Sequence, residues 1–146
     1  MSNNMHKVYL ALGSNLGDRE ATIQEAIRLI GERIGTVVSQ SSLIESEPWG
    51  FESEHTFLNG AILVETTLSP REVLAAIQQT ERDLGKNSSH ATKRRLLPTY
   101  KDRPIDIDIL LYDDLRVNEP DLKIPHPLMH ERPFVMQPLH EIMPTT

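Results

Sequence analysis

The sequence predicts an α+β fold, a ferredoxin-like βαββαβ sandwich in which both helices cover one face of the sheet. Two observations carry this prediction. Runs of β-branched and apolar residues alternate along the chain with two stretches whose apolar residues recur every three or four positions, which is the spacing of an amphipathic helix. The order of these runs is strand, helix, strand, strand, helix, strand, the pattern of a split βαβ unit.

The strands are expected at 6–12, 36–45, 56–66 and 104–112. The first helix follows a turn-forming cluster, with Asp18 or Thr22 as N-cap and Glu25 available to complete a capping box with Thr22. One face of this helix is apolar and should be core: Ile23, Ala26, Ile27, Ile30 and Ile34.

The second helix has the clearest start signal in the chain. Ser69 is the expected N-cap, Pro70 takes the first helical position, and Glu72 takes the capping-box position. The core face is expected at Val73, Ile77, Thr80 and Leu84, and Gly85 should end the helix. The proline-rich tail from 115 to 146 predicts a small extension of one short hairpin and brief helical turns.

Length and composition limit the classes of function. The 146 residues suit one domain over 1–146, and the absence of cysteine excludes disulfide scaffolds, zinc fingers, iron–sulfur clusters and thiol catalysis. Charges interrupt every long apolar run and the first residues are polar, so we expect no membrane association and a cytoplasmic location. The acidic balance of the chain, with a net charge of −6, disfavours nucleic-acid binding, and a monomer is expected.

Positive charge is concentrated in one segment, 86–103, which has neither helical nor alternating periodicity. Its six basic residues and one acidic residue give a net charge of +5, which leaves −11 for the rest of the chain. A long basic loop before the fourth core strand indicates a lid over an anionic ligand. The alternative is a solvated linker whose charge serves only solubility.

The strand at 104–112 carries the strongest local signal, the Asp106-Ile107-Asp108 triplet. Alternation places both carboxylates on one face, with Leu110 and Tyr112, while Ile105, Ile107, Ile109 and Leu111 take the other. Two carboxylates next to a basic loop suit Mg²⁺, which one or two carboxylates, water and substrate phosphates commonly hold, and this combination favours phosphoryl transfer. The alternative is a solvent-facing acidic strand that pairs with nearby arginines.

A second group of residues suggests a flat acceptor. Phe57 and Asn59 share a strand face, and Trp49, Tyr100 and Phe134 lie in or beside predicted turns and loops, so their rings could stack on a heterocycle whose edge an amide reads. Phe57 and Phe134 could equally be core residues.

The two histidines four apart near the tail do not form a convincing zinc motif. Prolines surround His126 and no HExxH pattern is present, so His126 and Arg132 are better interpreted as donors to phosphate.

Taken in order, several segments resemble the 6-hydroxymethyl-7,8-dihydropterin pyrophosphokinases, folate-pathway enzymes that transfer a diphosphoryl group from ATP. The resemblance runs from about Lys7 to Pro144, and it rests on VYLALGSNLGDR, SSLIESEPWG, FLNGAILVET, RPIDIDILLYDD and IPHPLMHERPFVMQPL. It implies a ferredoxin-like fold, ATP as co-substrate and two Mg²⁺ ions.

The resemblance also implies a site. Asp106 and Asp108 would hold both metal ions, with Arg103 and Arg95 as further catalytic contacts from the basic loop. The pterin would stack between Phe134 and Tyr100, and its remaining contacts would be Gly13, Ser46, Trp49, Phe57 and Asn59. The residues expected at ATP are Gln78, Glu81, Lys86, Arg103, Ile109, Lys123, His126 and Arg132. Asp121 stands where the family often has a cation.

Two further hypotheses are consistent with the residues themselves. A ferredoxin-like RNA-binding or small-ligand regulatory module would place aromatic residues and positive charge across the sheet, whereas this chain has two aspartates on the strand that borders the loop. A two-metal nuclease would need further carboxylates near Asp106 and Asp108, and the sequence does not identify them.

Overall fold

The computed structural model describes residues 5–15, 18–46, 56–85, 105–127 and 129–143. Its elements in chain order are β1 (His6–Ser14), α1 (Arg19–Arg33), β2 (Gly35–Gln40), β3 (Ile44–Ser46), β4 (Phe57–Thr66), α2 (Pro70–Gly85), β5 (Asp106–Tyr112), β6 (Val117–Glu119), β7 (Leu122–Ile124), η2 (Met129–Glu131) and α4 (Pro133–Ile142).

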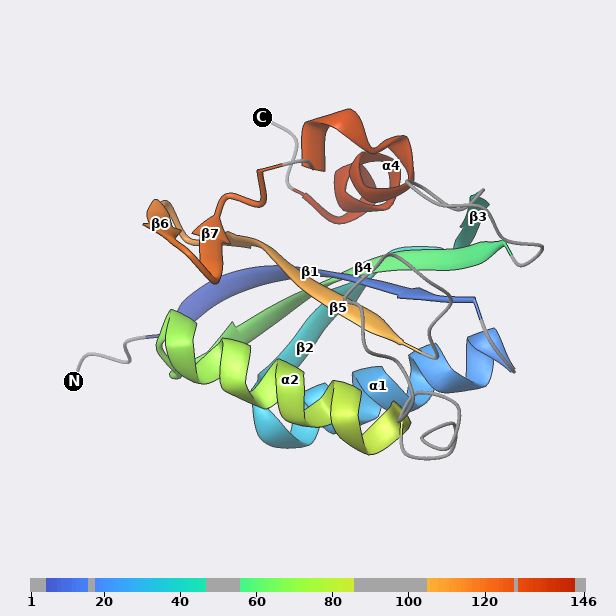
Figure 1. Cartoon of the computed structure of the whole chain (residues 1–146), viewed down its shortest axis with the longest axis horizontal. Coiled ribbons are helices and arrows are strands. Elements are labelled where there is room, and N and C mark those ends of the chain that lie inside the picture. The colour runs from blue at the N-terminus through green and yellow to red at the C-terminus, as the bar shows by residue number, and fades with distance from the viewer. Residues whose placement is uncertain (1–4, 16–17, 47–55, 86–104, 128, 144–146) are drawn as a thin grey trace.

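The strands form an antiparallel sheet in the order β2-β4-β1-β5, and β3 pairs with β4 beyond the end of β2. The two central strands are therefore β1 and β4, which is the order of the ferredoxin-like fold and confirms the predicted fold class. Helices α1 and α2 cover one face of the sheet, and α4 lies on the other (Figure 1). Strand β5 forms one edge of the main sheet, and β6 and β7 form a separate hairpin.

Both helices begin with side-chain caps. At α1 the carboxylate of Asp18 accepts from the Ala21 N–H at 3.2 Å, and Glu25 pairs with Arg28 rather than with Thr22. At α2 the predicted capping box is present, because the Glu72 N–H donates to the Ser69 hydroxyl at 3.2 Å and the Ser69 N–H donates to the Glu72 carboxylate at 2.8 Å.

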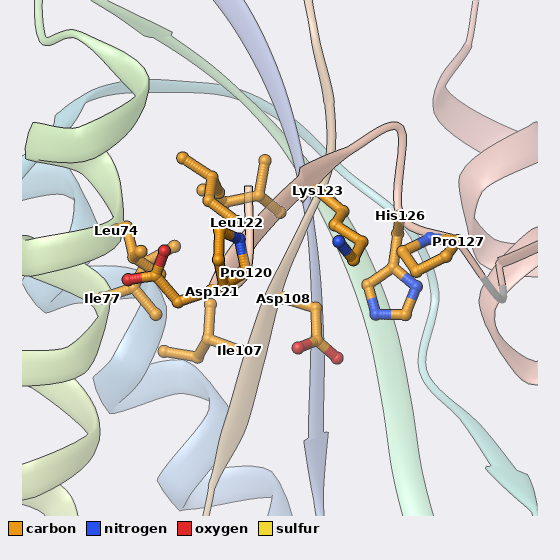
Figure 2. A pocket seen from close by; sticks show the side chains of 11 residues that line it. Leu74, Ile77, Ile107, Asp108, Pro120, Asp121, Leu122, Lys123, His126 and Pro127 are labelled. Carbon is orange, nitrogen blue, oxygen red and sulfur yellow. The ribbon is translucent and has the colours of Figure 1, made fainter. Parts of the chain in front are cut away.

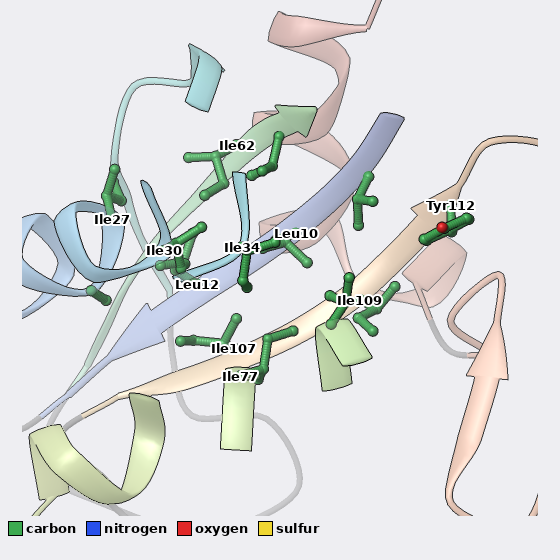
Figure 3. Packing of buried hydrophobic residues seen from close by; sticks show 14 of the residues in the cluster. Leu10, Leu12, Ile27, Ile30, Ile34, Ile62, Ile77, Ile107, Ile109 and Tyr112 are labelled. Atoms are coloured by element: carbon green, nitrogen blue, oxygen red, sulfur yellow. The ribbon is translucent and has the colours of Figure 1, made fainter. Parts of the chain in front are cut away.

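The main core lies between the sheet and these two helices (Figure 3). All five apolar residues predicted for the core face of the first helix are buried, and in α2 Val73, Ile77 and Thr80 are buried while Leu84 is half-buried. The amphipathic spacing of the sequence therefore identified the side of each helix that packs on the sheet.

The single strand predicted at 36–45 is two strands, β2 and β3, separated by residues 41–43. Ser41 causes the interruption. Its N–H donates to the Ala61 carbonyl at 2.9 Å, and its hydroxyl accepts from the Ala61 N–H at 2.9 Å, so a side chain replaces a backbone partner of β4. The pairing moves from Gln40 opposite Ile62 to Ile44 opposite Asn59, with one extra residue on the β2–β3 side.

The predicted alternation along 104–112 is correct as far as Leu110, which packs on the α4 side. The β1–β5 register shifts between Tyr9, which pairs with Leu111, and Leu10, which pairs with Ile109, so Leu110 is a bulge residue. Beyond the bulge the faces exchange. Tyr112 packs into the core beneath α1 and α2, whereas Leu111 packs on the α4 side.

The α4 side of the sheet has its own smaller core. Tyr9, Ala11 and Leu63 of the sheet pack there with Val135 and Leu139 of α4. Glu141 of α4 accepts from the N–H and the hydroxyl of Ser42, at 2.8 and 2.7 Å, which joins α4 to the β2–β3 connection. The tail thus contains the predicted hairpin and one helix longer than the expected turns. Among the described residues, no helix is long and apolar enough to cross a membrane.

Candidate active site

Asp106 and Asp108 lie half-buried on the α4 side of β5. Across the strand pair, Asp106 stands opposite Gly13 and Asp108 stands opposite Ala11, two of the smallest residues in β1. The intervening Ile107 is buried in the core on the helix side. Because residues two apart on a strand share a face, the two carboxylates project together beside small neighbours.

A row of residues crosses the sheet at the level of Asp106. Gly13 pairs with Asp106 on one side and with Asn59 of β4 on the other. A Cβ on Gly13 would lie 3.4 Å from the Asn59 Oδ1 and 3.5 Å from a ring carbon of Phe57. The absence of a side chain on Gly13 therefore lets the Asn59 amide and the Phe57 ring lie close to the backbone of β1, beside the strand position of Asp106.

The orientation of the Asn59 amide follows from its contacts with β3. Its Nδ2 donates to the Ile44 carbonyl at 3.2 Å and to the Ser46 hydroxyl at 2.9 Å. A backbone carbonyl can only accept, so the nitrogen must face β3 and the oxygen must face Gly13. Asn59 is 5% exposed, so its Oδ1 is a fixed acceptor directed at the Gly13 position.

His126 lies close to the aspartates on the same side of β5. The backbone N–H of His126 donates to the Leu110 carbonyl at 3.0 Å, and this hydrogen bond attaches the segment after β7 to the bulge of β5. Burial lowers the pKa of the His126 imidazole below its ordinary value, the charge of Arg132 lowers it further, and the carboxylate of Asp106 opposes both. His126 is therefore a neutral imidazole at pH 7, placed between a cation and a carboxylate.

A cavity of about 260 Å³ lies next to these residues, around the edge of β5 and between α2 and the β6–β7 hairpin. Figure 2 shows Ile107 turned toward α2 and Asp108 turned to the other side of β5, where His126 lies. The lining residues are Leu74, Ile77, Ile107, Asp108, Ile109, Pro120, Asp121, Leu122, Lys123, His126 and Pro127.

An arginine holds the outer wall of this cavity. Arg71, in the first turn of α2, donates two hydrogen bonds of 2.9 Å to the Asp121 carboxylate and also pairs with Glu119. The acidic residue at hairpin position 121 is therefore paired with a cation that α2 supplies. The Lys123 ammonium binds the Asn118 side chain at 3.0 Å and the Glu119 carbonyl at 3.1 Å within the same hairpin.

Three predicted ATP residues, Ile109, Lys123 and His126, line the cavity together with Asp108. Gln78 is exposed on α2. Glu81 makes a contact that the sequence did not reveal, because its carboxylate accepts from the Ile107 N–H at 2.8 Å. Glu81 therefore binds the backbone of β5 between the two aspartates.

The predicted acceptor residues come together from three strands and α4. Ser46 pairs with Phe57 across β3 and β4, and both are half-buried next to Asn59. Phe134, in the first turn of α4, is half-buried and packs against the smaller core, as does Met136. The predictions for Trp49, Lys86, Arg95, Tyr100 and Arg103 lie outside the described residues.

Seven lining residues were not predicted as site residues from the sequence: Leu74, Ile77, Ile107, Pro120, Asp121, Leu122 and Pro127. The spacing of Leu74, Gln78 and Glu81 could have indicated the α2 side of the cavity, because these residues lie about one helical turn from each other along one flank of the helix.

The donor set near Asp106 fits magnesium bound together with substrate phosphates. The part of the chain that the structure describes has no group of three or more His, Asp or Glu side chains placed to hold a metal ion. Two carboxylates on one strand face, next to small residues, can supply part of an oxygen coordination shell. Phosphate oxygens and water would complete that shell, as is usual for Mg²⁺.

Comparisons with known proteins agree on one family. The family model described as 7,8-dihydro-6-hydroxymethylpterin-pyrophosphokinase (HPPK) matches residues 9–144. The 2-amino-4-hydroxy-6-hydroxymethyldihydropteridine pyrophosphokinase of Porphyromonas gingivalis is 44% identical over 138 residues, which cover 94% of this chain and 90% of that protein. The enzyme of the same name from Bacillus subtilis is 39% identical over 135 residues, covering 92% and 76%.

Solved structures show the same fold at low identity. A Plasmodium falciparum HPPK-DHPS chain superposes with a TM-score of 0.74 at 16% identity, covering 98% of this chain and 43% of that one. This chain therefore spans less than half of the length of the fusion chain that it matches.

Proposed function

The chain belongs to the 7,8-dihydro-6-hydroxymethylpterin-pyrophosphokinase family, and we propose that its reaction takes place on the α4 side of the sheet, between Asn59, Asp106 and the cavity at β5. It is an ATP-dependent diphosphotransferase of folate synthesis that acts on 6-hydroxymethyl-7,8-dihydropterin. The observation that carries the proposed location is the Asn59-Gly13-Asp106 row, which places an amide and a carboxylate on either side of a residue without a side chain.

The nucleotide belongs in the cavity next to β5. Its apolar wall, formed by Leu74, Ile77 and Ile109, suits a base, and its polar side carries Lys123 and His126. His126 and Arg132 then face the phosphates, and Gln78, Lys86, Arg95 and Arg103 are the further proposed contacts. Glu81 contributes indirectly: its carboxylate accepts a hydrogen bond from the Ile107 N–H and so helps to fix β5, the strand that carries the two aspartates.

The pterin belongs at the Asn59 end of the row. The Oδ1 of Asn59 accepts from the N–H groups on the pterin edge, and Gly13 places no side chain next to the ring. Ser46, Phe57 and Phe134 complete this part of the site, together with Trp49 and Tyr100.

Asp106 and Asp108 are the proposed ligands of two Mg²⁺ ions. When bound, the ions neutralise charge on the phosphate oxygens. In the transfer itself the hydroxymethyl oxygen forms a bond to the β-phosphorus and releases its proton to water, and the bond from that phosphorus to the oxygen of the α-phosphate breaks, so that AMP leaves. The role of this chain's side chains is to align the two substrates, to donate a hydrogen bond to phosphate from the neutral His126 imidazole, and to meet negative charge with Arg132 and the basic residues of 86–103.

The reaction products test the function directly. The protein is incubated with ATP, Mg²⁺ and 6-hydroxymethyl-7,8-dihydropterin, and the nucleotide products are separated by ion-exchange chromatography. We expect AMP and the pterin diphosphate in equal amounts, and omission of the pterin or of Mg²⁺ should abolish both. Formation of ADP in place of AMP would contradict the assignment.

The nucleic-acid module is less well supported. Such a module uses the open face of its sheet, whereas here α4 packs on that face and the accessible part carries Asp106 and Asp108. A monomeric state and a cytoplasmic location stay predictions.

A further inference from the structure

Arg19, the first residue of α1, joins two segments that border the proposed pterin site. Its guanidinium donates to the Glu45 carboxylate at 2.8 Å, to the Thr56 carbonyl at 3.1 Å and to the Thr56 hydroxyl at 3.0 Å. Glu45 lies in β3 and Thr56 directly precedes β4. The Arg19 side chain is 27% exposed and its contacts with Thr56 are part-buried, whereas the Glu45 side chain is 59% exposed.

Strand β3 depends on such an attachment. It has three residues, and its only strand partner among the described residues is β4, through the pairs that run from Ile44 and Asn59 to Ser46 and Phe57. A three-residue edge strand makes few ladder hydrogen bonds, so side-chain contacts contribute much of what fixes its position.

The alternation of β3 links the Arg19 contact to the site. Successive residues of a strand point to opposite faces of the sheet. Glu45 points to the face that α1 covers, where Arg19 binds it, so its neighbours Ile44 and Ser46 lie on the other face. The Ile44 carbonyl and the Ser46 hydroxyl are the acceptors that orient the Asn59 amide. A shift of β3 along β4 would therefore break both contacts and leave Nδ2 with the 3.4 Å contact to the Phe57 carbonyl of β4, so that the amide could rotate.

From these contacts we propose that Arg19 is a positioning residue for the pterin: it fixes β3 against β4 and thereby keeps the Asn59 oxygen directed at the acceptor. This inference rests on the proposed function and adds a residue that touches neither substrate. The nucleotide cavity is lined by α2, β5 and the hairpin, and it shares no lining residue with the Arg19 contacts. Loss of Arg19 should therefore affect one substrate and spare the other.

The test compares Arg19→Ala with Arg28→Ala. Arg28 lies in the same helix and also forms ion pairs, with Glu25 and Glu32, but these are exposed and local to the helix. For each purified variant, KM is measured for the pterin and for ATP, and the pterin Kd is measured in the presence of α,β-methylene-ATP, which cannot transfer its diphosphoryl group. Thermal melting reports stability.

For Arg19→Ala we expect the pterin KM and Kd to rise about tenfold, because a correctly oriented hydrogen-bond acceptor is lost, while the ATP KM stays within about twofold. Arg28→Ala should leave all three constants unchanged. Arg19→Lys should be intermediate, since one ammonium cannot bridge Glu45 and Thr56 as a guanidinium does. Glu45→Gln should raise the pterin KM less than Arg19→Ala does, and combining the two should add nothing to Arg19→Ala alone.

An unchanged pterin Kd in Arg19→Ala, or equal increases in the KM of both substrates, would overturn the inference. If Arg19→Ala does not fold, Arg19→Lys and Glu45→Gln decide by the same criteria. A wild-type protein that forms no AMP overturns the proposed function and this inference with it. A wild-type protein that forms AMP, together with variants that show no selective loss of pterin binding, overturns the inference alone.

Discussion

Asp106 and Asp108 are the residues on which the chemistry depends most directly. Replacing either with asparagine keeps the size of the side chain and removes its charge, so we expect kcat to fall by at least about 100-fold because the charge on the phosphates is no longer balanced. Both side chains are half-buried beside small residues, so the thermal midpoint should change little. Steady-state kinetics with saturating Mg²⁺ measures the effect.

Asp114→Asn is the matched control, because Asp114 is an exposed aspartate just beyond the same strand. It should leave kcat unchanged. Equal activity of the wild type and the Asp106→Asn and Asp108→Asn variants would show that the carboxylates do not bind the metal ions.

The sequence could predict the shared face of these aspartates because the period of a strand is local. It could not predict the contact of Glu81 with the Ile107 N–H, since that hydrogen bond joins residues 26 positions apart from a helix to a strand. The orientation of Asn59 was equally out of reach, because it depends on acceptors in β3, a strand that the sequence did not separate from β2.

The turn between α1 and β2 requires a glycine at one position only. A Cβ on Gly35 would lie 2.0 Å from the Glu65 carbonyl oxygen, a backbone atom that cannot move without breaking the β2–β4 pairing. Gly35→Ala should therefore lower the free energy of unfolding by several kcal/mol, roughly 3 or more. Urea unfolding monitored by circular dichroism measures this loss.

Gly31→Ala, four residues earlier in α1, should have the opposite effect. A Cβ there meets a single Val37 carbon at 3.9 Å, an ordinary contact, and alanine favours a helix interior over glycine by about 0.5–1 kcal/mol. A comparable loss of stability in both variants would contradict the steric explanation at Gly35.

The attachment of α4 to the sheet should depend on pH through Glu141. Two hydrogen bonds from Ser42 hold the pKa of this carboxyl below the ordinary value of 4.5. The bond from the Ser42 N–H has the larger effect, and the bond from its hydroxyl has the smaller one. Because the folded-state pKa is lowered, this contribution to stability is complete above pH 4.5 and is lost as the pH falls through the folded-state value.

Glu141→Gln removes the titrating group. Its urea midpoint should lie below that of the wild type at pH 7, and the difference should shrink as the pH is lowered below 4.5. Glu131→Gln, at an exposed position just before α4, is the matched control and should leave the urea midpoint at pH 7 unchanged. A gap between wild type and Glu141→Gln that stays constant down to the acid transition would exclude this role.

The elements themselves were predicted well, and the errors fall at irregularities of the ladder. Local periodicity located both helices, the β4 strand and the α2 capping box. It missed the break at Ser41, where a side chain takes a backbone partner, and the bulge at Leu110, which exchanges the faces of Leu111 and Tyr112. Both features depend on the partner strand, whose register a single sequence does not display.

The fold as a whole followed from the order of elements, since a βαββαβ chain has few un-knotted arrangements with both helices on one face. The second face was harder to predict. The sequence of 133–142 indicated only brief turns, yet α4 begins at Pro133, where the missing N–H costs nothing, and its Val135 and Leu139 complete a second core against β1 and β4. That helix places Phe134 against the smaller core, on the side of the sheet where the site is proposed.

The charge distribution of the whole chain leads to a final prediction. The segment 86–103 carries a net charge of +5, while the rest of the molecule carries −11 and includes the two aspartates of the proposed metal site. Neutralising Lys93, Arg94 and Arg95 together to glutamine keeps the length of the segment and removes half of its basic residues. Because negative charge on the leaving phosphate grows during the transfer, we expect kcat to fall about 10- to 100-fold.

The pterin has no phosphate, so its Kd in the presence of α,β-methylene-ATP should change by less than about threefold in the same variant. Arg116→Gln, which removes one exposed cation between β5 and β6, controls for the change in net charge and should leave kcat unchanged. A triple variant with normal kcat would show that the positive charge of 93–95 serves solubility. A parallel loss of pterin binding would instead place these residues at the acceptor, because a contribution restricted to the phosphates cannot weaken the binding of an uncharged ring.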